Sequence, residues 1–148
     1  MTAQLPADSI ARLLESNIPG VVEGWEKEEV RVQPESLMDI CRFLKTEPRL
    51  QMDYLVAISA VDYIDHFEIV YHLASLGHNH AMVLKTRVYD RESPAVPSVV
   101  GIWQGANLQE REIWDLMGVS FTGHPNMKRI LTWEGFPGHP LQKSHLGG

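Results

Sequence analysis

The segment from residue 107 to residue 143 begins with a helical pattern and continues as a stretch rich in glycine and proline, and this change limits what the chain can fold into. Its first part predicts a helix, because apolar residues recur at helical spacing and Gly118 after them is typical of a helix end. Asn107 is the expected N-cap of this helix, and Glu110 lies at the spacing of a capping box. The apolar stripe consists of Ile113, Leu116 and Met117.

The rest of the chain, residues 119–148, is predicted to be an extended arm rich in glycine and proline. Two Gly-His-Pro tripeptides, at 123–125 and 138–140, interrupt regular structure there. The segment nevertheless carries large apolar side chains, which must be buried somewhere. The residues alone leave two interpretations open: the segment folds back on its own domain, or it is an arm laid over another protein.

The first 118 residues are predicted to form one α+β domain. Helical spacing predicts helices over 6–17 and from Pro34 to about residue 47, and Cys41 lies in the apolar stripe of the second helix. Strands are predicted at 21–25, 30–32, 54–63, 67–73 and 82–89. The order α-β-β-α-β-β-β predicts a two-layer sandwich with a mixed or antiparallel sheet, followed by the helix and the arm.

The residue patterns also predict which strands are buried. The strand at 54–63 is almost wholly apolar, which is typical of a strand covered on both faces. The strand at 67–73 alternates, which predicts one wetter face. The prolines of the segment 90–97 predict an irregular loop, after which Ser98 is expected to cap a short helical turn.

Charge and composition exclude several classes of protein. A net charge of −6 argues against a nucleic-acid-binding protein, which normally presents a basic face. No apolar run reaches the roughly 18 residues that span a bilayer, so membrane association is expected only through partners. The single cysteine excludes an internal disulfide and a thiolate-ligated iron–sulfur cluster built within the chain. The sequence has no recognisable secretory signal at its start, so we expect a cytosolic protein.

One ordered motif resembles a known family. Its parts are Glu110-Arg111-Glu112, Asp115-Leu116, Gly118, Phe121, Gly123-His124-Pro125, Arg129-Ile130-Leu131 and Gly138-His139-Pro140-Leu141-Gln142-Lys143. In type and order these residues resemble the signature of the thirty-kilodalton (C-type) subunit of NADH-quinone oxidoreductase, a small hydrophilic protein in the peripheral arm of respiratory complex I. Gln142 stands where the family usually has arginine and Ser144 where it usually has aspartate, which puts in doubt any salt bridge at that end of the motif.

The resemblance implies the same α+β architecture and a non-catalytic scaffold for the quinone-reducing module of a proton-pumping complex. It implies that the chain binds no cofactor itself, whereas NADH, FMN, iron–sulfur clusters and quinone belong to partner subunits. The implied partners are the large quinone-site subunit and the iron–sulfur subunits, at the cytoplasmic side of the cell membrane. The implied partner-contact residues are Glu110, Arg111, Glu112, Asp115, His124, Pro125, Arg129, Leu131, His139, Pro140 and Lys143.

Two other functions stay open. The first is the matching subunit of a ferredoxin-linked or membrane-bound hydrogenase-type relative. The second is a free-standing enzyme that uses the motif carboxylates and histidines. Against it, Arg111 and Asp115 have the spacing of an ordinary helix-surface pair, and the histidines lack the spacing of a metal site. We expect no active site in this chain, and we expect the Gly-His-Pro imidazoles to bond nearby backbone or carboxylate groups.

Overall fold

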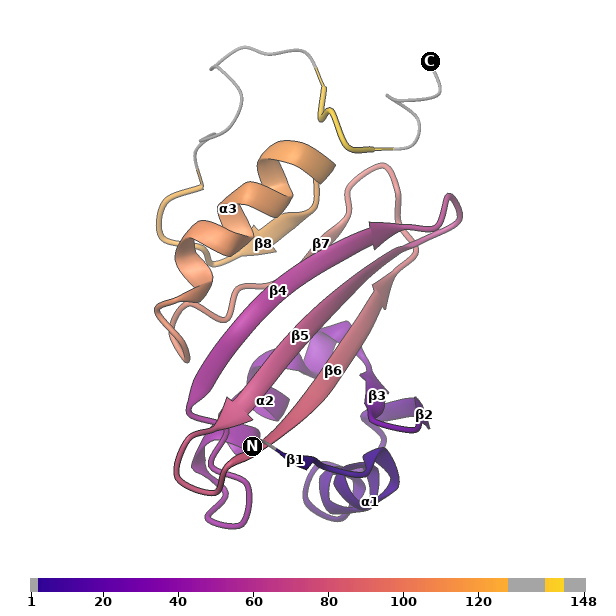
Figure 1. Cartoon of the computed structure of the whole chain (residues 1–148). Helices are drawn as coiled ribbons and strands as arrows, with labels where there is room; N and C mark the ends of the chain where they lie inside the picture. Colours follow the sequence, from indigo (N-terminus) through magenta and orange to yellow (C-terminus); the bar gives the residue numbers. More distant parts are fainter. Residues whose placement is uncertain (1–2, 128–137, 143–148) are drawn as a thin grey trace.

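The computed structural model describes residues 3–127 and 138–142, and it contains a sheet with helices on one face (Figure 1). The helices of this part are α1 (Ala7–Asn17), α2 (Leu37–Thr46, preceded by the 3₁₀ turn Pro34–Ser36) and α3 (Ala106–Met117). The strands are β1 (Ala3–Gln4), β2 (Val22–Glu26), β3 (Glu29–Val32), β4 (Tyr54–Asp62), β5 (Phe67–Ser75), β6 (His80–Val88), β7 (Ala95–Pro97) and β8 (Ser120–Thr122).

The main sheet is mixed, as predicted. Its order is β2-β3-β6-β5-β4, and β1 also pairs with β6. β4, β5 and β6 form an antiparallel meander, whereas β3 runs parallel to β6. In Figure 1, α2 lies behind the three long strands and their near face carries no helix. The α+β prediction is therefore confirmed, and one face of the sheet is open, with no helix of the described residues on it.

The two N-terminal helices form where the apolar spacing predicts them. Ile10 and Leu14 of α1 are buried, and so are Ile40 and Leu44 of α2. Cys41 lies in the same stripe and is fully buried, and this burial raises the pKa of its thiol. The prediction that Cys41 acts as a small buried hydrophobe is confirmed.

The predicted burial of two strands is wrong, because it depends on their places in the sheet. β4 is an edge strand whose exposed and buried residues largely alternate, and Tyr54 and Val56 are half exposed. β5 is a central strand, and it buries all but one of its residues, including Glu68 on the face that was expected to be wet. The apolar run 54–63 is therefore an edge strand in this sheet. The polar residues of the central strand β5 are buried because side chains of the neighbouring strands cover them.

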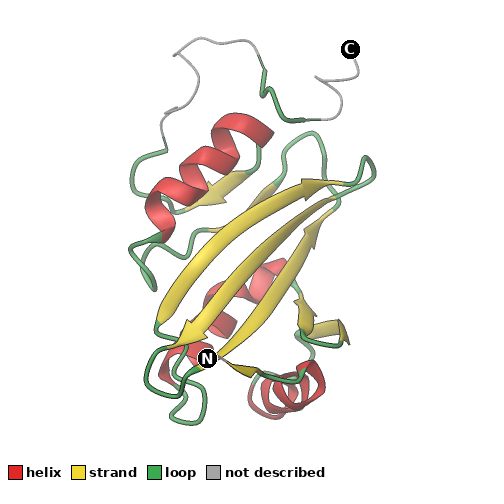
Figure 2. Cartoon of the chain, viewed as in Figure 1, coloured by secondary structure: helices red, strands yellow, loops and turns green. Residues whose placement is uncertain are grey.

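The segment after β6 is more regular than the prolines predict. Ala95–Pro97 forms β7, which pairs in parallel with β8 (Ser120–Thr122). Proline is tolerated in such a short strand at a sheet edge. The β7–β8 pair lies together with α3 at one end of the molecule (Figure 2).

The first residues of the predicted arm, around β8, belong to the hydrophobic core. Val119 and Phe121 are buried in the hydrophobic cluster, and Met127 packs against it. A chain that ended at Gly118 would lose these side chains from the core, so Met127 is the better end point for a truncated domain. The division into residues 1–118 and 119–148 otherwise stays a prediction.

Candidate partner interface around helix α3

Helix α3 organises the motif, although its N-terminus is not built as predicted. The helix begins at Ala106 after Gly105, and no side chain caps it. The predicted capping box of Asn107 and Glu110 is therefore wrong. Gly118 ends the helix in the left-handed region at φ 81°, which confirms the predicted C-terminus.

Glu110 points into the protein instead of returning to the helix end. Its side chain is fully buried, and its Oε1 accepts a 2.6 Å hydrogen bond from the Ser98 hydroxyl. Its Oε2 accepts a 2.8 Å bond from the backbone N–H of Val99. Burial raises the pKa of Glu110 to about 7, against the opposing effect of these two bonds. Glu110 therefore ties α3 to the turn after β7, and Ser98 in turn accepts a bond from the N–H of Val100.

The other charged residues of the motif helix divide between interior and surface. Asp115 is fully buried, so its predicted position on the helix surface is wrong. Arg111 is half-buried, whereas Glu112 is exposed. Among these residues only Glu112 has an exposed carboxylate.

The first Gly-His-Pro tripeptide attaches to the beginning of α3. His124 Nε2 donates a 3.1 Å bond to the carbonyl of Asn107. Its Nδ1 accepts a 2.9 Å bond from the backbone N–H of Asn126. Both nitrogens of the neutral ring are thus used, and Pro125 beside it is exposed.

The second Gly-His-Pro tripeptide attaches to the end of the same helix. His139 Nδ1 donates to the Asp115 carbonyl at 2.9 Å, and the ring lies edge-on to Trp114. The Leu141 N–H donates to the Leu116 carbonyl at 2.7 Å. The Gln142 amide donates to the Met117 carbonyl at 2.6 Å. Residues 138–142 thereby bond three carbonyls of the last helical turn, which have no partner within the helix.

These contacts decide the role of both imidazoles. The expectation that they bond nearby backbone groups is confirmed. In each case the histidine lies in a turn, between a glycine and a proline. Pro140 is half-buried in the second turn. Arg129, Leu131 and Lys143 lie outside the described residues.

The remaining histidines and acidic groups form no metal site in the part of the chain that the structure describes. No group of three or more His, Cys, Asp or Glu side chains there is placed to hold an ion. His78 and His80 stack at 5.3 Å, but their Nε2 atoms lie 2.8 Å from the carbonyls of Pro48 and Leu50. His78 is exposed and His80 is half-buried. No helix of residues 3–127 and 138–142 is long and apolar enough to cross a membrane.

Comparison with known proteins identifies the family. The family model described as "Respiratory-chain NADH dehydrogenase, 30 Kd subunit" matches residues 30–147. The chain belongs to this family. The match includes every described strand from β4 onward and the whole motif around α3.

Individual relatives agree with this assignment. A protein of Roseiflexus sp. strain RS-1, named as the C-type subunit of NADH-quinone oxidoreductase, is 45% identical over 117 residues, which cover 77% of this chain and 67% of the relative. A protein of Rhizobium meliloti with the same kind of name is 46% identical over 115 residues, 76% of this chain and 62% of the relative. The chain thus spans about two thirds of the length of these relatives.

A solved structure shares the fold. It is described as the membrane-bound sulfane sulfur reductase, an archaeal respiratory membrane complex. One of its chains matches with a TM-score of 0.74 and 24% identity, over 93% of this chain and 84% of that one. At this identity the match supports the architecture alone.

Gly118 shows how closely the second tripeptide approaches α3. A Cβ atom at Gly118 would lie 2.5 Å from Gln142 Nε2 and 2.8 Å from His139 Cδ2. We expect Gly118→Ala to lower the free energy of unfolding by about 1–2 kcal/mol, because the left-handed backbone is strained and residues 138–142 must shift. Urea denaturation measures the loss. Gly105→Ala is the matched control, since nothing lies within 4 Å of its Cβ position and its φ is −60°. Equal stability of the two variants would contradict this account of residues 138–142.

The sequence did not indicate two further polar features. The buried partner of Glu110 is Ser98, twelve residues away. The sequence pattern indicated each of the two residues as a helix-capping residue but did not indicate that they bond each other. Asp62 is buried at the end of β4 and holds the Arg91 guanidinium with two bonds of 2.7 and 3.0 Å. The signal for this pair is an aspartate that follows an apolar strand, which a single sequence does not distinguish from an ordinary turn residue.

Proposed function

We propose that this chain is a non-catalytic subunit in the peripheral arm of a proton-pumping NADH-quinone oxidoreductase-type complex, where it supports the quinone-reducing module. The proposal is carried by one observation: an acidic residue and two histidines of the motif form hydrogen bonds within their own chain. Glu110, His124 and His139 all bond groups of their own chain, so they hold α3 and its two attached turns in place. These bonds support a positioning role for the three side chains.

The proposal assigns the outward part of the same motif to partners. Glu112 and Pro125 are exposed beside the rigid frame that α3 provides. A preorganised surface binds a neighbour at low ordering cost, which suits a scaffold. The partners would be the large quinone-site subunit and the iron–sulfur subunits. NADH, FMN, the clusters and quinone would be bound by those subunits, at the cytoplasmic side of the membrane, and this chain would touch the membrane only through them.

Relatives named as subunits of NADH-quinone oxidoreductase support NADH as the electron donor. The matching subunit of a ferredoxin-linked or hydrogenase-type complex is the second candidate, because the fold recurs in an archaeal respiratory membrane complex of a different name. A free-standing enzyme has less support, since Glu110 is buried in the core and Glu112 is exposed.

Deletion of the gene in its own host tests the proposal and separates the two donors. We expect membranes of the deletion strain to lose NADH-driven quinone reduction, and the wild-type gene to restore it. Loss of ferredoxin- or hydrogen-driven reduction alone would favour the second candidate. Unchanged quinone reduction with every donor would contradict both.

A further inference from the structure

The open face of the sheet contains a hollow of about 440 Å³ between the β2–β3 hairpin and the neighbouring ends of β5 and β6. Its floor is formed by side chains that alternate with the buried residues of the core, among them Glu68, Lys85 and Arg87. None of these residues belongs to the motif around α3. The hollow is therefore a second surface that the proposed scaffold role does not use.

The charges of this hollow are balanced except at one position. Each of its three cations already lies beside a carboxylate. The pairs are Arg31 with Glu23 at 3.4 Å, Lys85 with Glu29 at 2.7 Å and with Glu68 at 3.3 Å, and Arg87 with Glu68 at 3.1 Å. Glu26 lines the same hollow, is exposed, and has no ion pair among the described residues. The uncompensated charge is thus negative, which favours a cation.

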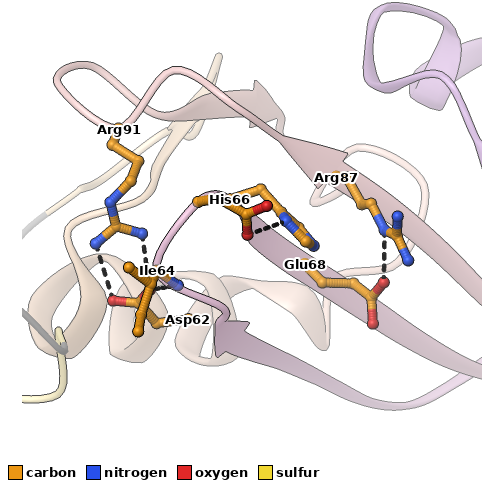
Figure 3. A network of polar contacts seen from close by, with 7 residues as sticks. Asp62, Ile64, His66, Glu68, Arg87 and Arg91 are labelled. Carbon is orange, nitrogen blue, oxygen red and sulfur yellow. Dashed lines mark hydrogen bonds and ion pairs between the residues drawn. The ribbon is translucent and has the colours of Figure 1, made fainter.

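His66 adds an unsatisfied acceptor to this hollow. The residue is 8% exposed, and its Nδ1 lies 2.8 Å from the exposed Asp65 carboxylate, which must accept the bond. In the neutral ring, Nε2 then carries a lone pair, and this buried atom has no hydrogen-bond partner among the described residues. In Figure 3 the His66 ring lies between the turn that carries Ile64 and the Glu68–Arg87 pair. For this neutral form of the ring, the missing partner of Nε2 is an N–H donor.

Aromatic rings complete the lining. Trp25 and Tyr63 both line the hollow, and they are 54% and 49% exposed. Tyr63 stacks on His66 at 5.0 Å, so its ring is held in a fixed place. Exposed aromatic faces attract cations, and a planar guanidinium stacks on them better than an ammonium does.

The turn beside the hollow is held in a strained conformation. Ile64 has φ 76°, which is rare for a β-branched residue, and its side chain is 68% exposed. The buried Asp62 fixes this turn, because its Oδ1 accepts a 2.8 Å bond from the Ile64 N–H while Arg91 holds both oxygens (Figure 3). Strain that the surroundings maintain is typical of contact sites. The exposed Ile64 stands two residues before His66, and the exposed Tyr89 ring lies 5.1 Å from the His66 ring.

We propose that this hollow is a docking site for a partner protein and receives the guanidinium of one of its arginine side chains. The guanidinium donates to the exposed Glu26 carboxylate and stacks on Trp25 or Tyr63, beside the unsatisfied Nε2 of His66. Apolar residues that flank the arginine pack on Ile64. This inference depends on the proposed function in one respect: the partner is taken to be another subunit of the same complex.

Titration of the ¹⁵N-labelled full chain with acetyl-Gly-Arg-Gly-amide tests the hollow without a partner. We expect saturable shifts of the Gly24 amide, the Trp25 indole N–H and the His66 ring nitrogens. The same peptide with citrulline, which keeps the shape and loses the charge, binds about tenfold more weakly or not at all. Glu26→Gln weakens the arginine peptide about tenfold, whereas Glu28→Gln, on the same hairpin but outside the hollow, leaves it unchanged. Absence of saturable shifts at these positions, or equal binding of both peptides, would overturn the proposal.

Cross-linking in the assembled complex tests the partner. A photoreactive p-benzoylphenylalanine in place of Trp25 is expected to label a peptide of another subunit at or beside an arginine. A label on a peptide without arginine, or no label in a complex that forms normally, would contradict the docking role. If no complex is recovered with the wild-type chain, the proposed function fails, and the peptide titration still decides whether the hollow binds a guanidinium.

Discussion

We expect Glu110→Ala to lower the free energy of unfolding by about 4 kcal/mol, the largest effect of any single substitution considered. The change leaves the Val99 N–H and the Ser98 hydroxyl without their acceptor in a fully buried site, and each unsatisfied buried group costs about 1–3 kcal/mol. The cavity left by the side chain adds to this loss. Urea denaturation of the full chain at pH 6 measures it.

Glu112→Ala is the control, because Glu112 is exposed and lies two residues along the same helix. Its effect is expected to stay within about 0.5 kcal/mol. If the two alanine variants unfold at the same urea concentration, Glu110 does not tie α3 to the turn after β7.

The second large effect is a dependence of stability on pH. The pKa of Glu110 is raised from 4.5 to about 7, so between these values the folded state binds more protons than the unfolded state. The stability contributed by the protonated group is complete below pH 4.5 and is lost as pH rises through about 7. Over this window the loss is about 3 kcal/mol, because one pKa unit corresponds to about 1.4 kcal/mol.

Glu110→Gln isolates this effect, since glutamine keeps the size of the side chain and does not titrate. We expect the difference in free energy of unfolding between wild type and Glu110→Gln to change by about 3 kcal/mol from pH 4.5 to pH 7.5. Of the two proteins, the wild type loses stability as the pH rises. A difference that stays constant over this range would show that Glu110 titrates as an ordinary carboxylate.

The sequence predicted the elements better than their environments. Helical spacing located α1 and α2, and alternation located β6, because these patterns depend on one buried face. The same rules failed for β4 and β5, whose burial depends on their places at the edge and centre of the sheet. Strand order is a property of the tertiary fold, and no local pattern of one sequence determines it.

The candidate site shows the same limit. The motif residues were recognised in order, and the two Gly-His-Pro turns were expected to bond backbone, as they do. Glu110 was assigned to a helix cap because its spacing from Asn107 fits one. Its actual partner, Ser98, approaches only when the turn after β7 folds against α3, so the contact could not be read from spacing.

The hollow on the open face has no counterpart in the sequence prediction. Trp25 and Glu26 are neighbours in β2, whereas His66 directly precedes β5, and the three share no motif. They meet because β3 pairs with β6 and β6 pairs with β5. A scaffold with one surface at α3 and another on the sheet would contact two neighbours, which suits a protein inside an assembly.

The central claim is that this chain works as one subunit of a quinone-reducing complex. Affinity purification of the tagged chain from membranes of its own host, with identification of the proteins recovered, tests this most directly. The account predicts recovery of the large quinone-site subunit with iron–sulfur subunits, and the electron-input subunit recovered with them would identify the donor. Recovery of the chain alone, as a monomer, would contradict the account.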